Sequence, residues 1–139
     1  MNILGISEGF HDAAVCVLRN NRIIFASQAE RFSGVKNDKW IHSDQLPKTE
    51  KYKPDVIAYY EKPFRKNLRR LYSGQGWKKI TTNFDVSFGH HESHAAAGYY
   101  TAPFDECNVL VIDAIGEWDT ISIWKGSVEN GYMGQKTHT

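Results

Sequence analysis

The sequence has few of the features that mark specialised classes of protein. Its two cysteines, Cys16 and Cys107, lie in predicted strands without the spacing of a metal site, so we expect both to be buried thiols. The sequence has no apolar run long enough to span a bilayer and no basic leader at its start, which predicts a cytoplasmic protein without membrane contact. The formal net charge of +1 favours no polyanionic partner, so we expect no nucleic acid.

Length and pattern predict a single α/β domain. At 139 residues and 41% hydrophobic content, the chain is long enough to bury one hydrophobic core and too short for two domains that each bury their own. Three short apolar runs at residues 2–7, 13–18 and 22–27 predict consecutive antiparallel strands, that is, a meander. Further strands are predicted at residues 56–60, 85–88, 108–112 and 120–124, and a hairpin turn at 129–131 predicts another strand from Tyr132.

The remaining segments predict helices and loops. Residues 28–40 are predicted to be a loop, followed by a brief helix at 43–46 that ends at Pro47. Residues 64–72 carry apolar residues at helical offsets, which predicts a helix that buries Phe64, Leu68, Leu71 and Tyr72. The other face of this helix is expected to be a solvated basic surface made of Arg65, Lys66, Arg69 and Arg70.

Half of the six histidines fall within five residues, at the start of the predicted helix 90–100. Residues four apart share one helix face, so His90 and His94 present two imidazoles to one point. Asp113 ends the apolar run 108–112, and carboxylates at strand ends commonly face a crevice. Imidazole suits zinc or iron, so these three residues are a candidate metal site.

This motif also has a simpler interpretation. Histidines at a helix start are more often solvated, capping, or packed against the core than bound to metal, and the motif alone does not decide between these roles. A zinc-protease site is disfavoured, because the His-Glu-x-x-His spacing from His91 requires histidine at position 95, which is Ala95.

The connection between the first two strands is unusual for a turn. Residues 8–12 contain Gly9, which lets the backbone approach a ligand closely, and His11 followed by Asp12, which form a candidate acid or base with its orienting partner. A polar hairpin loop with no chemistry is the alternative, and these residues alone favour it.

Three stretches together resemble a known family. They are residues 5–14, residues 30–32, and above all residues 89–96 (Gly-His-His-Glu-Ser-His-Ala-Ala) with 113–118 (Asp-Ala-Ile-Gly-Glu-Trp). Together they resemble the N-terminal part of the carbamoyltransferases of the NodU/CmcH type, which include the antibiotic O-carbamoyltransferases. The domain is also similar to the universal tRNA threonylcarbamoyl transferase subunit. One departure is Ala114, where the family usually has glycine.

The resemblance implies the N-terminal lobe of an actin-like ATPase (ribonuclease H-like) fold, a mixed sheet flanked by helices that begins with the meander. It also implies a transferase. In that family a carbamoyl group from carbamoyl phosphate is activated on ATP as carbamoyl adenylate in a C-terminal YrdC-like domain. The N-terminal domain then transfers it to a hydroxyl of a small molecule.

The resemblance also implies site residues. His90, His94 and Asp113 match the metal ligands, with iron or zinc as the expected ion. His11 matches the histidine near the acceptor, a candidate general base that Asp12 orients. Four further residues match positions that bind substrate or nucleotide: Lys36, Arg31, Gly116 and Glu117.

Family members are several times longer, so the resemblance implies that residues 1–139 form a single partial domain without the C-terminal half and the YrdC-like domain. We therefore expect the chain to be inactive alone and to need a separate chain that supplies the rest. A non-catalytic actin-like remnant that binds metal, nucleotide or a protein partner is the alternative. The tRNA-modifying branch is disfavoured because residues 30–32 and 61–63 look like the small-molecule branch.

Overall fold

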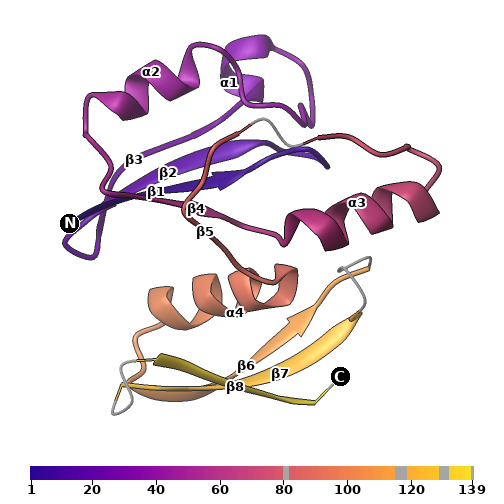
Figure 1. Ribbon diagram of the computed structural model, residues 1–139. Helices are drawn as coiled ribbons and strands as arrows, with labels where there is room; N and C mark the ends of the chain where they lie inside the picture. The colour runs from indigo at the N-terminus through magenta and orange to yellow at the C-terminus, as the bar shows by residue number, and fades with distance from the viewer. Residues whose placement is uncertain (80–81, 115–118, 129–131, 139) are drawn as a thin grey trace. The chain divides into compact units, whose positions relative to one another are not determined.

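The computed structural model describes residues 1–79, 82–114, 119–128 and 132–138 (Figure 1). Contacts divide the chain into two compact units, Met1–Tyr60 with Lys79–Ser87 and Glu61–Lys78 with Phe88–Thr139. Within the described ranges, every helix is too short or too polar to cross a membrane.

The first unit is built on a five-stranded mixed sheet. Its strands are β1 (Asn2–Ser7), β2 (Ala14–Arg19), β3 (Arg22–Gln28), β4 (Val56–Tyr59) and β5 (Val86–Ser87), in the order β3-β2-β1-β4-β5. The first three strands pair antiparallel, as the sequence predicts, whereas β4 pairs parallel with β1 and β5 pairs parallel with β4. Asn20 and Asn21 both have positive φ, which closes the β2–β3 hairpin with the right twist.

Alternation along the strands builds the core of this unit. The core residues Leu4, Ile6, Val15, Val17 and Tyr59 are at most 4% exposed, and the pairs within β1 and β2 are each two positions apart. Side chains two apart in a strand point to the same face. Leu46 of α2 (Gln45–Glu50) packs against this cluster. The Cys16 and Cys107 thiols, expected to be buried, are each only half-buried, and this partial burial raises the pKa of the Cys16 thiol.

Two predictions about the β3–β4 crossover are wrong. Residues 28–40 are not all loop, because α1 (Glu30–Ser33) forms there and ends at Gly34, which has a φ of 70°. Pro47 does not end the second helix, because α2 continues to Glu50. Pro47 lies in the first turn of α2, where backbone N–H groups have no partner within the helix, so its missing N–H costs nothing there. Figure 1 shows α1 and α2 on the same side of the sheet.

The second unit contains α3 (Pro63–Tyr72), α4 (His90–Thr101) and a three-stranded sheet of β6 (Glu106–Ile112), β7 (Ile121–Ser127) and β8 (Tyr132–His138). The strands are antiparallel in the order β6-β7-β8, and α4 runs along this sheet (Figure 1). Ala95 and Tyr99, one turn apart on α4, pack with Val111 of β6 to form its core. The predicted bounds of α4 are close to those observed, and β6 and β7 are longer than predicted.

The orientation of α3 is the reverse of the prediction. Phe64 and Tyr72, expected in the core, are 65% and 80% exposed. Four polar residues of the helix are buried instead: Lys66, Asn67, Arg69 and Arg70. The prediction that this basic face is solvated is wrong for Lys66, Arg69 and Arg70 and confirmed for Arg65, which is exposed.

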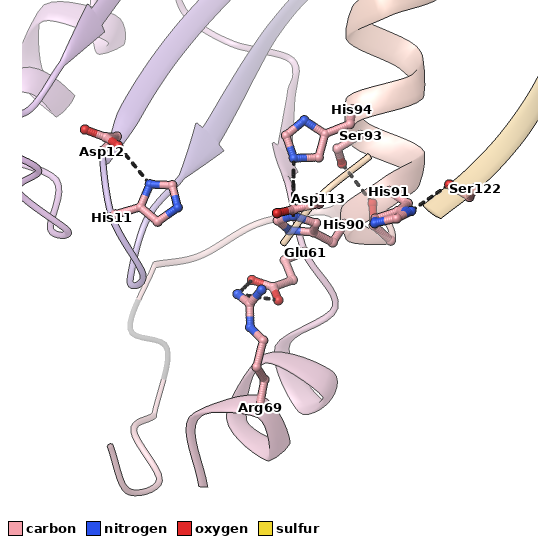
Figure 2. Close-up of polar contacts among 11 residues, drawn as sticks. His11, Asp12, Glu61, Arg69, His90, His91, Ser93, His94, Asp113 and Ser122 are labelled. Carbon is pink, nitrogen blue, oxygen red and sulfur yellow. Dashed lines mark hydrogen bonds and ion pairs between the residues drawn. The ribbon is translucent and has the colours of Figure 1, made fainter. Parts of the chain in front are cut away.

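A buried carboxylate accounts for this reversal. Glu61 is completely buried and lies two residues before α3. The Arg69 guanidinium Nη2 lies 2.9 Å from Glu61 Oε1 and 3.1 Å from Oε2, and Lys66 Nζ lies 3.7 Å from Oε2; Figure 2 shows the Glu61–Arg69 contact. A buried charge is tolerated only when it is paired, so Glu61 holds the cationic face of α3 inward.

We predict that Glu61→Gln lowers the free energy of unfolding by about 3 kcal/mol, because it leaves two buried cations without their carboxylate. Chemical denaturation measures the change. Glu106→Gln is the matched control, because it breaks an ion pair with Lys125 of the same 2.9 Å length on the surface, where such pairs contribute little. Equal effects of the two substitutions would contradict the role given to Glu61.

We also predict that Gly126→Ala lowers the free energy of unfolding by about 1–3 kcal/mol, the usual cost of overpacking a core. A Cβ at Gly126 would overlap with Cδ2 of the buried Tyr99 ring, so the ring or the strand must move. Gly5→Ala is the control, because its Cβ would meet only the Cys16 carbonyl oxygen, at 3.8 Å. A Gly126→Ala protein as stable as Gly5→Ala would rule out this close contact.

Candidate functional site

The histidines are held by a well-formed helix start. Gly89 precedes α4 in an extended conformation, and its N–H donates to Glu92 Oε2 at 3.0 Å. The Ser93 hydroxyl donates to the Gly89 carbonyl oxygen at 3.1 Å. A carboxylate in the first turn also interacts favourably with the positive end of the helix dipole, so Glu92 stabilises this end of α4 in two ways.

Three of the predicted site residues come together in the second unit. Asp113 follows β6, and its backbone N–H donates to the Thr120 carbonyl oxygen at 2.8 Å. Asp113 Oδ2 lies 2.6 Å from His90 Nε2 and 3.8 Å from His94 Nε2, and the two Nε2 atoms are 3.2 Å apart (Figure 2). The side chain of His90 is only 10% exposed, whereas that of His94 is 56% exposed, so the cluster opens to solvent on the His94 side.

The donor set fits a first-row metal ion. One ligand atom from each residue lies within 4.8 Å of the others. Ligands at about 2.05 Å around a tetrahedral ion are about 3.3 Å apart, and two of the three distances, 3.2 and 3.8 Å, are close to this value. The 2.6 Å between His90 and Asp113 is that of a direct hydrogen bond, so the pair would separate by about 0.7 Å around an ion.

The sequence patterns did not predict a second polar contact of α4. His91 Nδ1 lies 2.6 Å from Ser122 Oγ on β7, and both side chains are buried (Figure 2). Trp124 Nε1 donates to the same Ser122 oxygen at 2.8 Å. The sequence did hold a signal, because His91 is four and eight residues before the buried Ala95 and Tyr99 and therefore lies on their helix face.

His11 and Asp12 lie in the first unit, in the β1–β2 connection. His11 Nδ1 is 2.8 Å from Asp12 Oδ2 (Figure 2), and Asp12 adopts a φ of 48°, which is uncommon for a residue other than glycine. The side chain of His11 is 61% exposed. The connection therefore presents an accessible imidazole beside a carboxylate.

A neighbouring segment fixes the backbone of this connection. The Ala13 N–H donates to the Asp38 carbonyl oxygen at 2.7 Å, and the Gly9 N–H donates to that of Lys39. Hydrogen bonds from the Ser33 hydroxyl and the Trp40 N–H lower the pKa of the Asp38 carboxyl. Asp38 is therefore ionised at neutral pH and holds the segment that supports the His11 loop.

Of the four other predicted binding residues, the structure describes two. Arg31 and Lys36 are exposed in the first unit, in and just after α1, and Arg31 makes a long ion pair of 4.0 Å with Glu30. Gly116 and Glu117 lie outside the described residues. The structure therefore brings together His90, His94 and Asp113, and separately His11 and Asp12.

Comparison with known proteins finds longer relatives. An uncharacterized protein of Synechocystis sp. is 29% identical over 167 residues, covering 90% of this chain and 27% of that protein. An uncharacterized protein of Methanocaldococcus jannaschii is 31% identical over 118 residues, covering 83% of this chain and 22% of that protein. The chain thus spans only about a quarter of the length of these curated relatives.

A match to a family model shows the family to which the chain belongs. The model for the N-terminus of carbamoyltransferases matches residues 50–138, which is more than half of the chain. The matched stretch contains all of α3, α4, β6 and β7 and the three clustered residues His90, His94 and Asp113. The chain therefore belongs to the family of carbamoyltransferase N-termini.

Proposed function

We propose that this chain is the acceptor- and metal-binding portion of a carbamoyltransferase of the NodU/CmcH type. It would transfer a carbamoyl group from carbamoyl adenylate to a hydroxyl of a small molecule. The observation that carries the proposal is the family match over residues 50–138, together with the convergence of His90, His94 and Asp113 within that stretch. ATP and carbamoyl phosphate are the proposed sources of the adenylate.

The fold proposed for this portion is the actin-like, ribonuclease H-like lobe. The sheet order β3-β2-β1-β4-β5 supports it, with an antiparallel meander followed by two parallel strands. Since the chain spans about a quarter of the length of its relatives, we propose that turnover requires the portion that those relatives have beyond the matched region.

We propose that His90, His94 and Asp113 hold an iron or zinc ion. Such an ion, when bound, supplies Lewis-acid stabilisation of the negative charge that develops on the carbamoyl oxygen. Two imidazoles and a carboxylate suit either metal, and three protein ligands leave a coordination position for substrate. The exposure of His94 is consistent with access from solvent.

His11 is the proposed general base. The Asp12 carboxylate only accepts hydrogen bonds, so the 2.8 Å contact places the ring proton on His11 Nδ1 and leaves Nε2 able to take a proton. The acceptor oxygen forms a bond to the carbamoyl carbon, the bond from that carbon to the phosphate oxygen of the adenylate breaks, and the hydroxyl proton passes to Nε2. Arg31 and Lys36 are proposed to bind the anionic parts of the donor.

We predict that the chain binds about one equivalent of zinc or iron and that the His90→Ala/His94→Ala variant loses it, because two of three ligands are gone. Elemental analysis after metal loading and gel filtration measures the content. The matched control is His11→Ala/His42→Ala, which removes two histidines from the first unit and should retain the metal. A wild-type chain that binds no metal would contradict the proposed metal site.

We also predict that carbamoyl transfer requires this chain and its His11. The assay combines carbon-14-labelled carbamoyl phosphate, ATP and a panel of sugars and alcohols with the part of the Synechocystis relative that lies beyond the region matched here. Label should enter a hydroxyl compound only when this chain is added. His11→Asn should slow transfer by about a hundredfold, the usual contribution of a general base, whereas His42→Asn should not. Transfer that does not depend on this chain, or that His11→Asn leaves unchanged, would refute the proposal.

A further inference from the structure

The first turn of α4 is attached to the sheet at two places. His90 contacts Asp113 after β6, and the next residue, His91, contacts Ser122 on β7 at 2.6 Å. The second contact is deeply buried, since His91 is 6% exposed and Ser122 is completely buried. Such a contact is sheltered from competing water, so it is well suited to fix a position.

The hydrogen-bond donors around Ser122 indicate which residue donates in this contact. The Trp124 indole N–H only donates, so Ser122 Oγ accepts from it at 2.8 Å. The Ser122 hydroxyl has one hydrogen of its own, and His91 Nδ1 is the other polar side-chain atom in contact with it among the described residues. Ser122 therefore donates to Nδ1. In this arrangement His91 Nε2 carries the ring hydrogen, and this atom is buried and makes no hydrogen bond to any described residue.

Strand register connects this bond to the histidine cluster. Ser122 lies opposite Val111 on β6, two residues before Asp113. Consecutive residues of α4 are thus tied to the two strands of one antiparallel ribbon. Because side chains project about 100° apart along a helix, a rotation of the first turn that releases His91 from Ser122 also moves His90 away from Asp113.

The other packing contacts of α4 lie further along the helix. Ala95 and Tyr99 pack against the sheet one and two turns after His91. On this packing face, His91 is the buried residue of the first turn. Loss of the His91–Ser122 bond should therefore change the orientation of His90 and His94 more than it changes the fold of the unit.

We propose that His91 is a positioning residue, which aims His90 and His94 at Asp113 through its hydrogen bond with Ser122. The inference rests on the proposed metal site for its functional meaning, while the positioning itself concerns only the chain's own residues.

Four variants separate positioning from general stability. His91→Leu keeps most of the volume and removes the hydrogen bond, and Ser122→Ala removes the same bond from the other side. His91→Asn keeps a polar atom near the place of Nδ1 and should rescue. Tyr99→Phe is the matched control, because it removes a 2.8 Å hydrogen bond to the Asp105 carbonyl oxygen from the other end of the same helix.

Cobalt(II) titration provides the first readout, through the affinity and the visible absorption of the bound ion. Loss of a residue that orients metal ligands usually weakens metal binding about 10–100-fold. We expect that loss in His91→Leu and Ser122→Ala, with a shifted absorption band. We expect wild-type behaviour within about threefold in His91→Asn and Tyr99→Phe. Wild-type affinity in His91→Leu, or an equal loss in Tyr99→Phe, would overturn the proposal.

Imidazole nitrogen-15 NMR of the metal-free chain gives a readout that does not depend on the metal site. The wild type should show His91 with its hydrogen on Nε2 and His90 hydrogen-bonded to Asp113. The His90–Asp113 bond should be lost in His91→Leu and kept in His91→Asn. If the wild type binds no cobalt, the proposed metal site fails, yet this NMR pattern would still support positioning. A His90–Asp113 bond that persists in His91→Leu would overturn it.

Discussion

The close approach of α4 to the β6–β7 ribbon is the constraint on which the histidine cluster depends. Ala95 is completely buried, a Cβ at Gly98 would lie 3.2 Å from Val109 Cγ1, and Gly126 leaves no space between its strand and the Tyr99 ring. Small residues thus let the helix lie close enough for the short side chain of His90 to reach Asp113. Larger side chains at these positions would lift the helix and separate the two groups.

Buried charge, rather than apolar periodicity, sets the orientation of α3. The apolar offsets of residues 64–72 satisfy every rule for an amphipathic helix, and the helix forms where they predict it. The pattern does not predict which face is buried. Glu61 lies outside the helix, so its ion pairs with Lys66 and Arg69 are not part of the helical pattern. An unpaired buried carboxylate is a larger penalty than an exposed aromatic ring, so the charges decide.

The parts of the fold that follow local rules were predictable from the sequence. Strand alternation identified the meander, and the paired asparagines identified its second turn. The His90–Asp113 contact was predictable because helix spacing and a strand end are both local features. The His91–Ser122 contact was not, because it joins residues 31 apart whose meeting depends on how α4 rotates over the ribbon. Short-range patterns carry no information about that rotation.

The two parts of the proposed chemistry rest on different observations. The proposed metal ligands lie inside the stretch that the carbamoyltransferase model matches, and the i, i+4 spacing of His90 and His94 on a helix fixes their separation. His11 lies before that stretch, so its role rests on its accessible ring, its bond to Asp12 and the resemblance of the β1–β2 connection. A failure of His11 as a base would therefore leave the proposed metal site intact, and a chain without metal would leave the geometry of His11 and Asp12 unchanged.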